Sequence, residues 1–280
     1  MTEKFNLSRR SLLSAGTLAL ALGGGLLPSL ALAQSISTIK SRGKVLIGIQ
    51  GDNPPWGFVN NAGASDGFDA VIGKAFAKFL GVDAEFVPLA VVNRIPALTT
   101  GRVDILFATM AMLPERAKVV QFSKPYVANI IQLVGAKATS IKTNADMKNV
   151  VIGVPRSSVQ DTQITRNAPE GTTIRRYDDD AATIQALVSG QVEAVGANMF
   201  YLDRINQAKP GVYETKLEFT RLFNGACTRL GDKELNAAAN SFVDQIKTNG
   251  VLKGAYETWM KQPPPDPFPD SVEGVPFVAS

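Results

Sequence analysis

Histidine is absent from this 280-residue sequence, and cysteine occurs once, at Cys227. Without histidine, Ser-His-Asp and Cys-His catalysis and the ordinary zinc sites are excluded. A lone cysteine cannot form an internal disulfide, and its commonest role is that of a buried apolar side chain. These two absences remove a large share of enzyme chemistry before any motif is considered.

The net charge of the chain is also small. The chain has 29 basic and 25 acidic side chains, for a formal net charge of +4. Lys4, Arg9, Arg10 and Glu3 give residues 1–33 a net charge of +2, which leaves the rest of the chain near +2. The basic balance therefore gives little support for nucleic-acid binding.

The N-terminus has the pattern of an export signal. Arg9 and Arg10 precede an uncharged run over 12–32, which is rich in alanine, leucine and glycine and ends in Ala-Leu-Ala. This pattern predicts a cleaved signal peptide over 1–33, and the arginine pair indicates the twin-arginine route to the periplasm. The alternative is a transmembrane anchor, which the glycines and the proline within the run disfavour. No later apolar run approaches the roughly 20 residues that a membrane-spanning helix needs.

After the signal, short apolar strands alternate with amphipathic helices, which is the pattern of an α/β protein. Strands are expected at 45–49, 84–87, 103–108, 150–154, 173–176 and 193–196. Helices are expected at 69–80, 94–100, 157–166, 180–189, 199–207, 233–249 and 252–260. Asp69 and Asp180 are the expected N-caps of two of these helices, since aspartate accepts hydrogen bonds from free backbone N–H groups. The proline-rich C-terminal tail, 263–280, is expected to run extended along the surface.

Seven short motifs follow one another in an order that resembles a known family. The first half contributes Asp-Asn-Pro-Pro-Trp-Gly-Phe at 52–58, Gly-Phe-Asp at 67–69, Asn-Arg-Ile-Pro-Ala-Leu at 93–98 and Thr-Gly-Arg-Val-Asp at 100–104. The others lie at 108–117 with 122–126, at 152–154 and at 186–195. Together they resemble family 3, the polar amino-acid family, of periplasmic solute-binding proteins of ABC transporters, over nearly the whole mature chain.

The resemblance implies an α/β fold of two Rossmann-like lobes joined by two hinge crossover strands, the type II periplasmic binding protein fold. Lobe 1 would combine 36–133 with 227–262, and lobe 2 would span 134–226. The implied function is to bind an amino acid or amino-acid derivative by hinge closure and to deliver it to an ABC permease in the inner membrane. A monomer is expected, with a small carboxylate-bearing ligand and with no cofactor, no metal and no nucleic acid.

The resemblance also implies where the ligand's carboxylate binds. Arg116 matches the family arginine that pairs with the α-carboxylate, and a guanidinium forms a two-pronged, permanently charged fork for that group. Thr109 and Ala111 lie in the turn before it, where Thr109 keeps a hydroxyl and Ala111 offers only its backbone N–H. Ser158 and Val159 begin a predicted helix whose free N–H groups favour an anion. A surface arginine and a plain N-cap serine are the alternatives for Arg116 and Ser158.

The rest of the ligand is assigned to four further residues. Trp56 and Phe58 match an aromatic stretch beside the cleft mouth, although aromatic residues after a proline pair are also ordinary core residues. Asn53 stands where relatives often carry an aromatic residue. Arg94 matches the arginine that reaches the ligand side chain in the acidic-amino-acid branch, and its alternative is a solvated arginine at a helix start.

Asn198 departs from the family pattern, in which an aspartate usually neutralises the ligand's ammonium group. Asparagine carries no charge, so a primary ammonium would lose its ionic partner there. Either another acid such as Asp161 or Glu193 substitutes, or the ligand nitrogen is substituted, as in an opine-type sugar–amino-acid conjugate. Both interpretations stay open at this point.

A metal site and two other functions are weighed against the transport role. The Asp178-Asp179-Asp180 run could suggest a metal site, but three consecutive carboxylates on a turn point different ways. An exported enzyme on the same fold, such as a cyclohexadienyl-type dehydratase, would need a general acid in the cleft, and Glu193 is a weak candidate. A ligand sensor would close in the same way but contact a receptor. No catalytic residue is assigned.

Overall fold

The computed structural model describes residues 35–279, so the predicted signal peptide, 1–33, lies outside the described residues. Its centre is an eight-stranded sheet in the order β5-β1-β6-β11-β7-β10-β8-β9. The strands are β1 (Lys44–Gln50), β5 (Asp83–Leu89), β6 (Ile105–Leu106), β7 (Val120–Ala136), β8 (Ile152–Pro155), β9 (Ile174–Tyr177), β10 (Ala194–Asn198) and β11 (Tyr213–Arg229). A second, three-stranded sheet consists of β2 (Asp52–Asn53), β3 (Gly57–Val59) and β4 (Ser65–Asp66).

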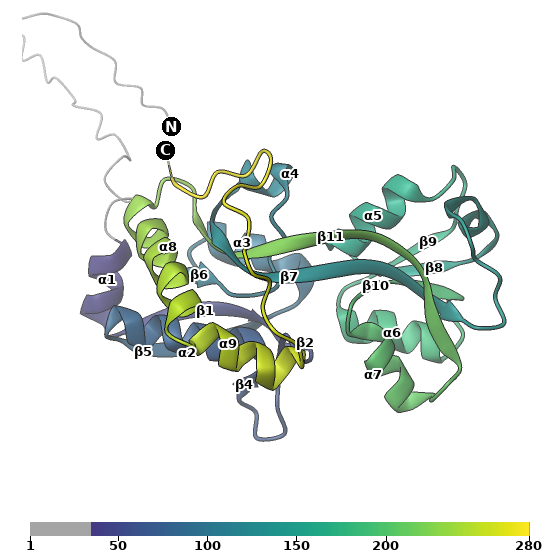
Figure 1. Ribbon diagram of the computed structural model, residues 1–280, viewed down its shortest axis with the longest axis horizontal. Coiled ribbons are helices and arrows are strands. Elements are labelled where there is room, and N and C mark those ends of the chain that lie inside the picture. The colour runs from purple at the N-terminus through teal and green to yellow at the C-terminus, as the bar shows by residue number, and fades with distance from the viewer. Residues whose placement is uncertain (1–34, 280) are drawn as a thin grey trace, which may run out of the picture. The chain divides into compact units, whose positions relative to one another are not determined.

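Two groups of parallel strands lie on either side of the long pair β7 and β11. β1 runs parallel to β5 and β6, while β8 runs parallel to β9 and β10. β7 and β11 have 17 residues each and pair with each other in antiparallel fashion along most of their length. We call the part built on β1, β5 and β6 lobe one, and the part built on β8, β9 and β10 lobe two; β7 and β11 join them (Figure 1). The predicted two-lobed α/β architecture is confirmed.

Helices cover the strands of each lobe. Lobe one carries α1 (Ser35–Arg42), α2 (Phe68–Leu80), α3 (Arg94–Thr99), α4 (Pro114–Ala117), α8 (Lys233–Thr248) and α9 (Val251–Ala255), with the single helical turns η2 (Val91–Asn93) and η4 (Tyr256–Met260). Lobe two carries α5 (Val159–Asn167), α6 (Asp180–Val188), α7 (Tyr201–Ala208) and the turn η3 (Asn144–Asn149). Among residues 35–279, no helix combines the length and the apolar character needed to cross a membrane.

The local sequence explains the start and the end of α2. Phe68, Ile72, Phe76 and Leu80 recur at helical spacing and are all buried, so this face packs into the core of lobe one. The helix ends where Gly81 adopts a left-handed conformation with φ of 74°, which lets its N–H satisfy carbonyls of the last turn. Asp69 is not the N-cap, contrary to the prediction: it is fully buried inside the first turn and makes contacts elsewhere.

Other sequence expectations shift by a few residues. The strand predicted at 103–108 is shorter in the structure, where β6 comprises only Ile105–Leu106. The N-cap of α6 is Asp179, whose side chain accepts a hydrogen bond from the Ala182 N–H, so the prediction of Asp180 is wrong by one residue. Cys227 is free and fully buried on β11, as its type suggested.

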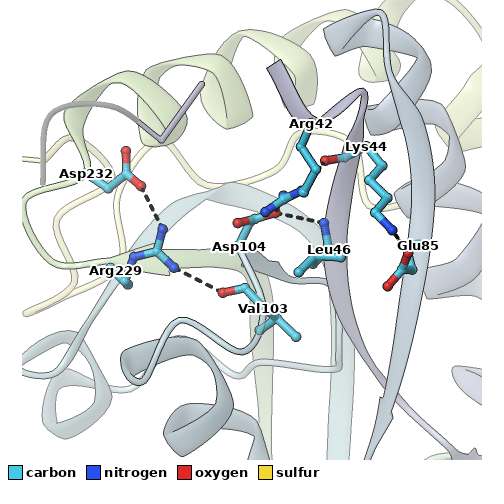
Figure 2. Close-up of polar contacts among 8 residues, drawn as sticks. All are labelled: Arg42, Lys44, Leu46, Glu85, Val103, Asp104, Arg229 and Asp232. Atoms are coloured by element: carbon cyan, nitrogen blue, oxygen red, sulfur yellow. Dashed lines mark hydrogen bonds and ion pairs between the residues drawn. The ribbon is translucent and has the colours of Figure 1, made fainter. Parts of the chain in front are cut away.

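Polar contacts tie together the strands of lobe one (Figure 2). Asp104 accepts hydrogen bonds from the Arg42 guanidinium and from the Leu46 N–H, which fixes the loop before β6 against β1. Arg229, at the end of β11, donates to the Val103 carbonyl oxygen at 3.0 Å. Side-chain hydrogen bonds therefore reinforce the backbone hydrogen bonds between neighbouring strands of lobe one.

The C-terminal tail docks on lobe one. Val275 is 4% exposed and packs in a core cluster with Met110 and Val120. Gln121 of β7 donates to the Pro276 carbonyl oxygen at 2.8 Å, and Asn240 of α8 donates to that of Phe277 at 2.6 Å. The tail crosses the lobe as an extended strap, drawn in yellow in Figure 1, and it is more firmly packed than a segment lying along the surface.

Candidate functional site

A cavity lies where the two lobes face each other. Its volume is only about 20 Å³, room for about one water molecule, so the two walls nearly meet in this structure. Residues of lobe one, of the crossover strand β7 and of lobe two line it: Gln50, Asn53, Val91, Arg94, Thr109, Ala111, Asn129, Ile131, Ser158, Val159, Gln160, Asp180 and Asn198. No aromatic ring belongs to this lining set, and most of the side chains are polar.

Arg94 is the cation of the lobe-one wall. It is 5% exposed, and its Nη1 donates to the Ala108 carbonyl oxygen at 2.7 Å while its Nε donates to that of Val91 at 3.1 Å. Burial lowers the pKa of the guanidinium, because a charged group is disfavoured away from water. None of the ion pairs within residues 35–279 includes Arg94, so its buried positive charge is available to a partner in the cavity that it lines. The solvated-arginine alternative does not describe this geometry.

The turn that carries Thr109 is held from behind by Asp69. Thr109 has a φ of 49°, an uncommon value for a residue with a branched side chain. Its backbone N–H donates to Asp69 Oδ2 at 3.0 Å, and the Tyr126 hydroxyl donates to Asp69 Oδ1 at 3.0 Å. Burial raises the pKa of Asp69 to about 7. Asp69 thus fixes the backbone that presents the Thr109 hydroxyl to Gln50, with which it is in close contact.

Asp180 is the anion of the lobe-two wall, and the sequence analysis did not assign it to the site. It is 1% exposed at the first turn of α6. Gln50 of lobe one donates to its Oδ2 at 2.8 Å, and the Tyr201 hydroxyl donates to its Oδ1. Burial, reinforced by the neighbouring Asp52, raises the pKa of Asp180 to about 6. The signal in the sequence was the aspartate run itself, but only the helix register decides which of the three carboxylates points inward.

The other two aspartates and the two suggested substitute acids point elsewhere. Asp179 caps α6, and Asp178 is an exposed residue 3.8 Å from Arg156. Asp161 pairs with Arg176 at 3.0 Å, and Glu193 is exposed; neither lines the cavity. Among the described residues, no group of three or more acidic or cysteine side chains is placed to hold a metal ion. The only carboxylate in the lining set is therefore that of Asp180.

Asn198 and Asn53 bind to each other across the cavity. Asn198 Nδ2 donates to Asn53 Oδ1 at 3.1 Å, while Asn198 Oδ1 accepts from the Phe200 N–H at 2.9 Å. The two positions that depart from the family pattern are thus a matched pair. An aspartate at 198 has no amide hydrogens to donate, and an aromatic ring at 53 has no oxygen to accept them.

Ser158 and Val159 contribute the other part of the lobe-two wall. The Ser158 hydroxyl accepts from the Asp161 N–H at 3.0 Å, so its N-cap role is confirmed. Val159 is the first residue of α5, and the N–H groups of a first helical turn have no intrahelical acceptor. Ala111 lies in the same small apolar cluster as Val159 and Ile131. This end of the cavity therefore offers backbone donors between small side chains.

Arg116 lies beside that end and is not in the lining set. It is 8% exposed; its Nη1 contacts the Ala111 carbonyl oxygen at 3.4 Å, and its Nη2 donates to that of Ser157 at 3.1 Å. Burial lowers the pKa of Arg116 to about 9, which leaves it charged at neutral pH. The alternative of a surface arginine is wrong, because Arg116 is buried and connects α4 of lobe one to the loop before α5 of lobe two.

Trp56 and Phe58 do not line the cavity. Trp56 is fully buried between Phe68, at 6.1 Å between ring centroids, and Phe200, at 5.6 Å. Phe58 packs on Trp259, at 5.9 Å. Both rings therefore take the packing role that was the alternative, although the Trp56–Phe200 contact joins the two lobes.

Asn129 is a further lining residue that the motifs missed. It lies on β7, is 7% exposed, and its Oδ1 has no hydrogen-bond partner within residues 35–279. A buried amide oxygen without a partner is costly, and one that faces a cavity can be satisfied by a ligand. No motif could have identified it, because its role depends on where the crossover strand passes the cavity.

Comparisons with known proteins agree with this architecture. Residues 45–262 match the family described as bacterial extracellular solute-binding proteins, family 3. The chain is 29% identical over 258 residues to the L-cystine-binding protein TcyJ of Escherichia coli (strain K12), which covers 91% of this chain and 96% of the relative. Two solved structures also match. An ancestral arginine-binding protein bound to arginine has a TM-score of 0.74 and 32% identity, covering 78% of this chain and 98% of its own. The ancestral amino acid-binding protein AncCDT-1, a precursor of cyclohexadienyl dehydratase, has a TM-score of 0.72 and 30% identity, covering 80% and 98%.

Proposed function

Because the chain belongs to family 3 of the bacterial extracellular solute-binding proteins, we propose that it captures a polar amino acid in the periplasm and delivers it to an ABC permease. The observation that carries the proposal is the buried charge at the cleft. Lobe one has two buried guanidiniums, Arg94 in the cavity wall and Arg116 beside it, and lobe two has the buried carboxylate of Asp180 in its wall. An α-amino acid carries one charge of each sign, so it can satisfy both lobes together.

This division of charge gives a reason for hinge closure. A ligand closes the cleft to the extent that it binds the closed state better than the open one. A zwitterion that touches only one lobe meets one of the two charges, whereas closure brings both into contact. The hinge lies in β7 and β11, and the lobe boundaries 36–133 with 227–262 and 134–226 are part of this proposal.

We assign the α-carboxylate to the end formed by Ala111 and Val159, beside Arg116. Backbone N–H groups and a guanidinium are the donors that bind carboxylates best. Asp180 takes the ammonium group in place of the aspartate that relatives carry at position 198. Arg94, Thr109 and Asn129 remain for the ligand side chain, which should therefore be hydrophilic and rich in hydrogen-bonding groups.

The charge of Asp180 also bears on the choice between a free amino acid and an opine-type conjugate. The conjugate was suggested because Asn198 is uncharged, and Asp180 restores the missing charge within the same cavity. A free amino acid is therefore the first candidate, and the conjugate the second. A secondary ammonium group would also pair with Asp180, so both candidates belong in the same binding test.

Two further features of the proposal concern partners and reaction. We assign no catalysis, since Glu193, the general acid considered for a dehydratase, is exposed and outside the lining set. The protein is proposed to act as a monomer that docks on its permease in the closed form.

A thermal-shift panel tests the ligand class. It would compare L-arginine, L-cystine, L-glutamine and L-glutamate with an N-substituted conjugate such as a fructosyl amino acid. Stabilisation by at least one free amino acid is the expected result. Stabilisation by the conjugate alone would transfer the proposal to the second candidate, and turnover of any compound on incubation would contradict the assignment as a binding protein. Mass spectrometry of ligand that co-purifies with the protein would then identify the natural solute.

A further inference from the structure

Five hydrogen bonds join the two lobes at one end of the cavity without involving a ligand. Their lobe-one partners are Gln50, Asp52 and Asn53; their lobe-two partners come from α6, from the end of β10 and from α7. One of the five, from Gln50 to Asp180, belongs to the proposed ligand site. The other four connect Asp52, Asn53, Ala181, Asn198 and Arg204, and we call this set the clasp.

Arg204 of α7 makes the largest contribution to the clasp. Its Nη1 donates to Asn53 Oδ1 at 3.1 Å, and its Nη2 donates to the Asp52 carbonyl oxygen at 2.9 Å. The guanidinium carbon lies 5.5 Å from the centre of the Tyr201 ring, so a ring of its own lobe also supports it. A rigid, two-pronged donor on lobe two thus grips adjacent residues of β2 in lobe one.

The remaining clasp bonds reinforce the same contact. The Ala181 N–H, at the start of α6, donates to Asp52 Oδ2 at 2.9 Å, and Asn198 donates to the same Asn53 oxygen as Arg204. The rings of Trp56 and Phe200 meet edge to face directly beside these bonds. The hydrogen bonds of the clasp and the Trp56–Phe200 contact therefore both join the two lobes.

The clasp lies largely outside the cavity. Asp52, Ala181 and Arg204 are not among its lining residues, so a ligand does not need to displace their bonds. These bonds exist only when the lobes are together, because their partners belong to different lobes. They consequently stabilise the closed state whether or not a ligand is bound.

We propose that the clasp sets the open–closed equilibrium of the protein itself, with Arg204 as its main positioning residue. The apparent affinity of a closing protein is its intrinsic affinity scaled by the population of the competent state. The clasp raises that population, and hence the affinity for every ligand by the same factor. The proposal rests on the two-state closure of the proposed function but not on the identity of the ligand.

The test measures the distance between the lobes in the ligand-free protein. Lys78→Cys in α2 and Glu170→Cys in lobe two place probes on exposed residues, and the native Cys227 is fully buried and will not react. Single-molecule energy transfer between dyes on these positions is compared in the parent, in Arg204→Met and in Arg204→Lys. Methionine keeps much of the stem but removes both donors, while lysine keeps the charge without the fork.

The matched control is Arg175→Met. Arg175 donates to the Gln191 carbonyl oxygen at 2.8 Å within lobe two, so this variant loses an arginine and a hydrogen bond but no contact between lobes. We expect Arg204→Met to shift the distribution towards the longer distance, Arg204→Lys to fall between, and Arg175→Met to match the parent. Equal distributions in Arg204→Met and Arg175→Met would overturn the proposal.

Binding measurements give a second, independent criterion. Arg204→Met should weaken binding of every amino acid that the parent binds by the same factor, roughly tenfold for the loss of a charged donor, and their order of preference should not change. A loss confined to one ligand would assign Arg204 to specificity and contradict the clasp. If the parent binds none of the free amino acids, the proposed function fails, and the distance distributions still decide the clasp.

Discussion

The two walls of the cavity differ in the sign of their buried charge. The lobe-one wall presents Arg94, held by backbone carbonyl oxygens, whereas the lobe-two wall presents Asp180, held by the donors of Gln50 and Tyr201. Neither lobe carries both charges in the lining set. Under the proposed function, the recognition site for a zwitterion therefore does not exist on either lobe alone and is completed only by closure.

The largest expected effect follows from removing the second cation of lobe one. Arg116→Met should reduce the affinity for any carboxylate ligand by about 100-fold or more, since a buried charged donor and its contact with lobe two are both lost. Isothermal titration calorimetry measures the affinity. Arg166→Met, on the exposed face of α5, is the control and should bind as the parent does. Unchanged affinity in Arg116→Met would refute the carboxylate assignment.

The next prediction uses pH to neutralise lobe two alone. The pKa of Asp180 is raised to about 6, so lowering the pH from 7 to 5 protonates it and should weaken binding of an amino acid by about tenfold. Stability should move the other way. A carboxyl whose pKa is higher in the folded than in the unfolded protein binds more protons when folded, so the unfolding free energy of the ligand-free protein gains from Asp180 and Asp69 as the pH falls from about 7 towards 4.

Calorimetry and thermal melts at the two pH values would check both signs. Asp180→Asn provides the control, because its affinity should lose most of the pH dependence. A parent protein whose affinity is the same at pH 5 and pH 7 would remove Asp180 from the ammonium site.

The lobes also differ in that the C-terminal tail covers lobe one. A truncation would test what this tail contributes to stability. Removing residues 263–280 exposes the pocket of Val275 and breaks the contacts of the tail with Gln121 and Asn240. We expect a loss of about 1.5–3 kcal/mol in the unfolding free energy, the value of burying one such side chain. Hydrogen exchange should become faster in α8 and in the neighbouring part of β7, with lobe two unaffected. Equal acceleration in α6 and α7 would show that the tail stabilises both lobes.

The smallest effect is expected at Phe58. Its ring packs on Trp259 and not in the cavity, so Phe58→Leu should change the affinity less than about twofold while lowering the melting temperature slightly. A titration and a thermal melt on the same variant separate the two effects. A large loss of affinity would instead indicate that Phe58 contacts the ligand.

The fold could be predicted from the sequence almost completely, because strand and helix patterns are local. Gly81 ends α2 and Ser158 caps α5 at the residues where their types predict it. The two-lobed arrangement was implied by the family resemblance. That resemblance rests on the order of the motifs along the chain and does not depend on how side chains are placed.

The site was predicted less completely, for a physical reason. Arg94 and Thr109 stand in family motifs, and Ser158 was predicted at the start of a helix; all three line the cavity. Asp180 and Asn129 were missed because their roles depend on one residue of helix register and on the course of a crossover strand. The Asn53–Asn198 pair shows the same limit: two departures 145 positions apart have one explanation, which appears only when the lobes meet.

We propose that Asp180 takes the place of the missing aspartate at position 198 as the partner of the ligand's ammonium group. Calorimetry of the parent and of Asp180→Asn, each with the tightest-binding amino acid and with its 2-hydroxy acid analogue, tests it most directly, with Asp178→Asn as the exposed control. We predict that Asp180→Asn loses about 10- to 100-fold in affinity for the amino acid and little for the hydroxy acid, which has no ammonium group. Equal losses for the two ligands, or no loss for the amino acid, would contradict this role of Asp180.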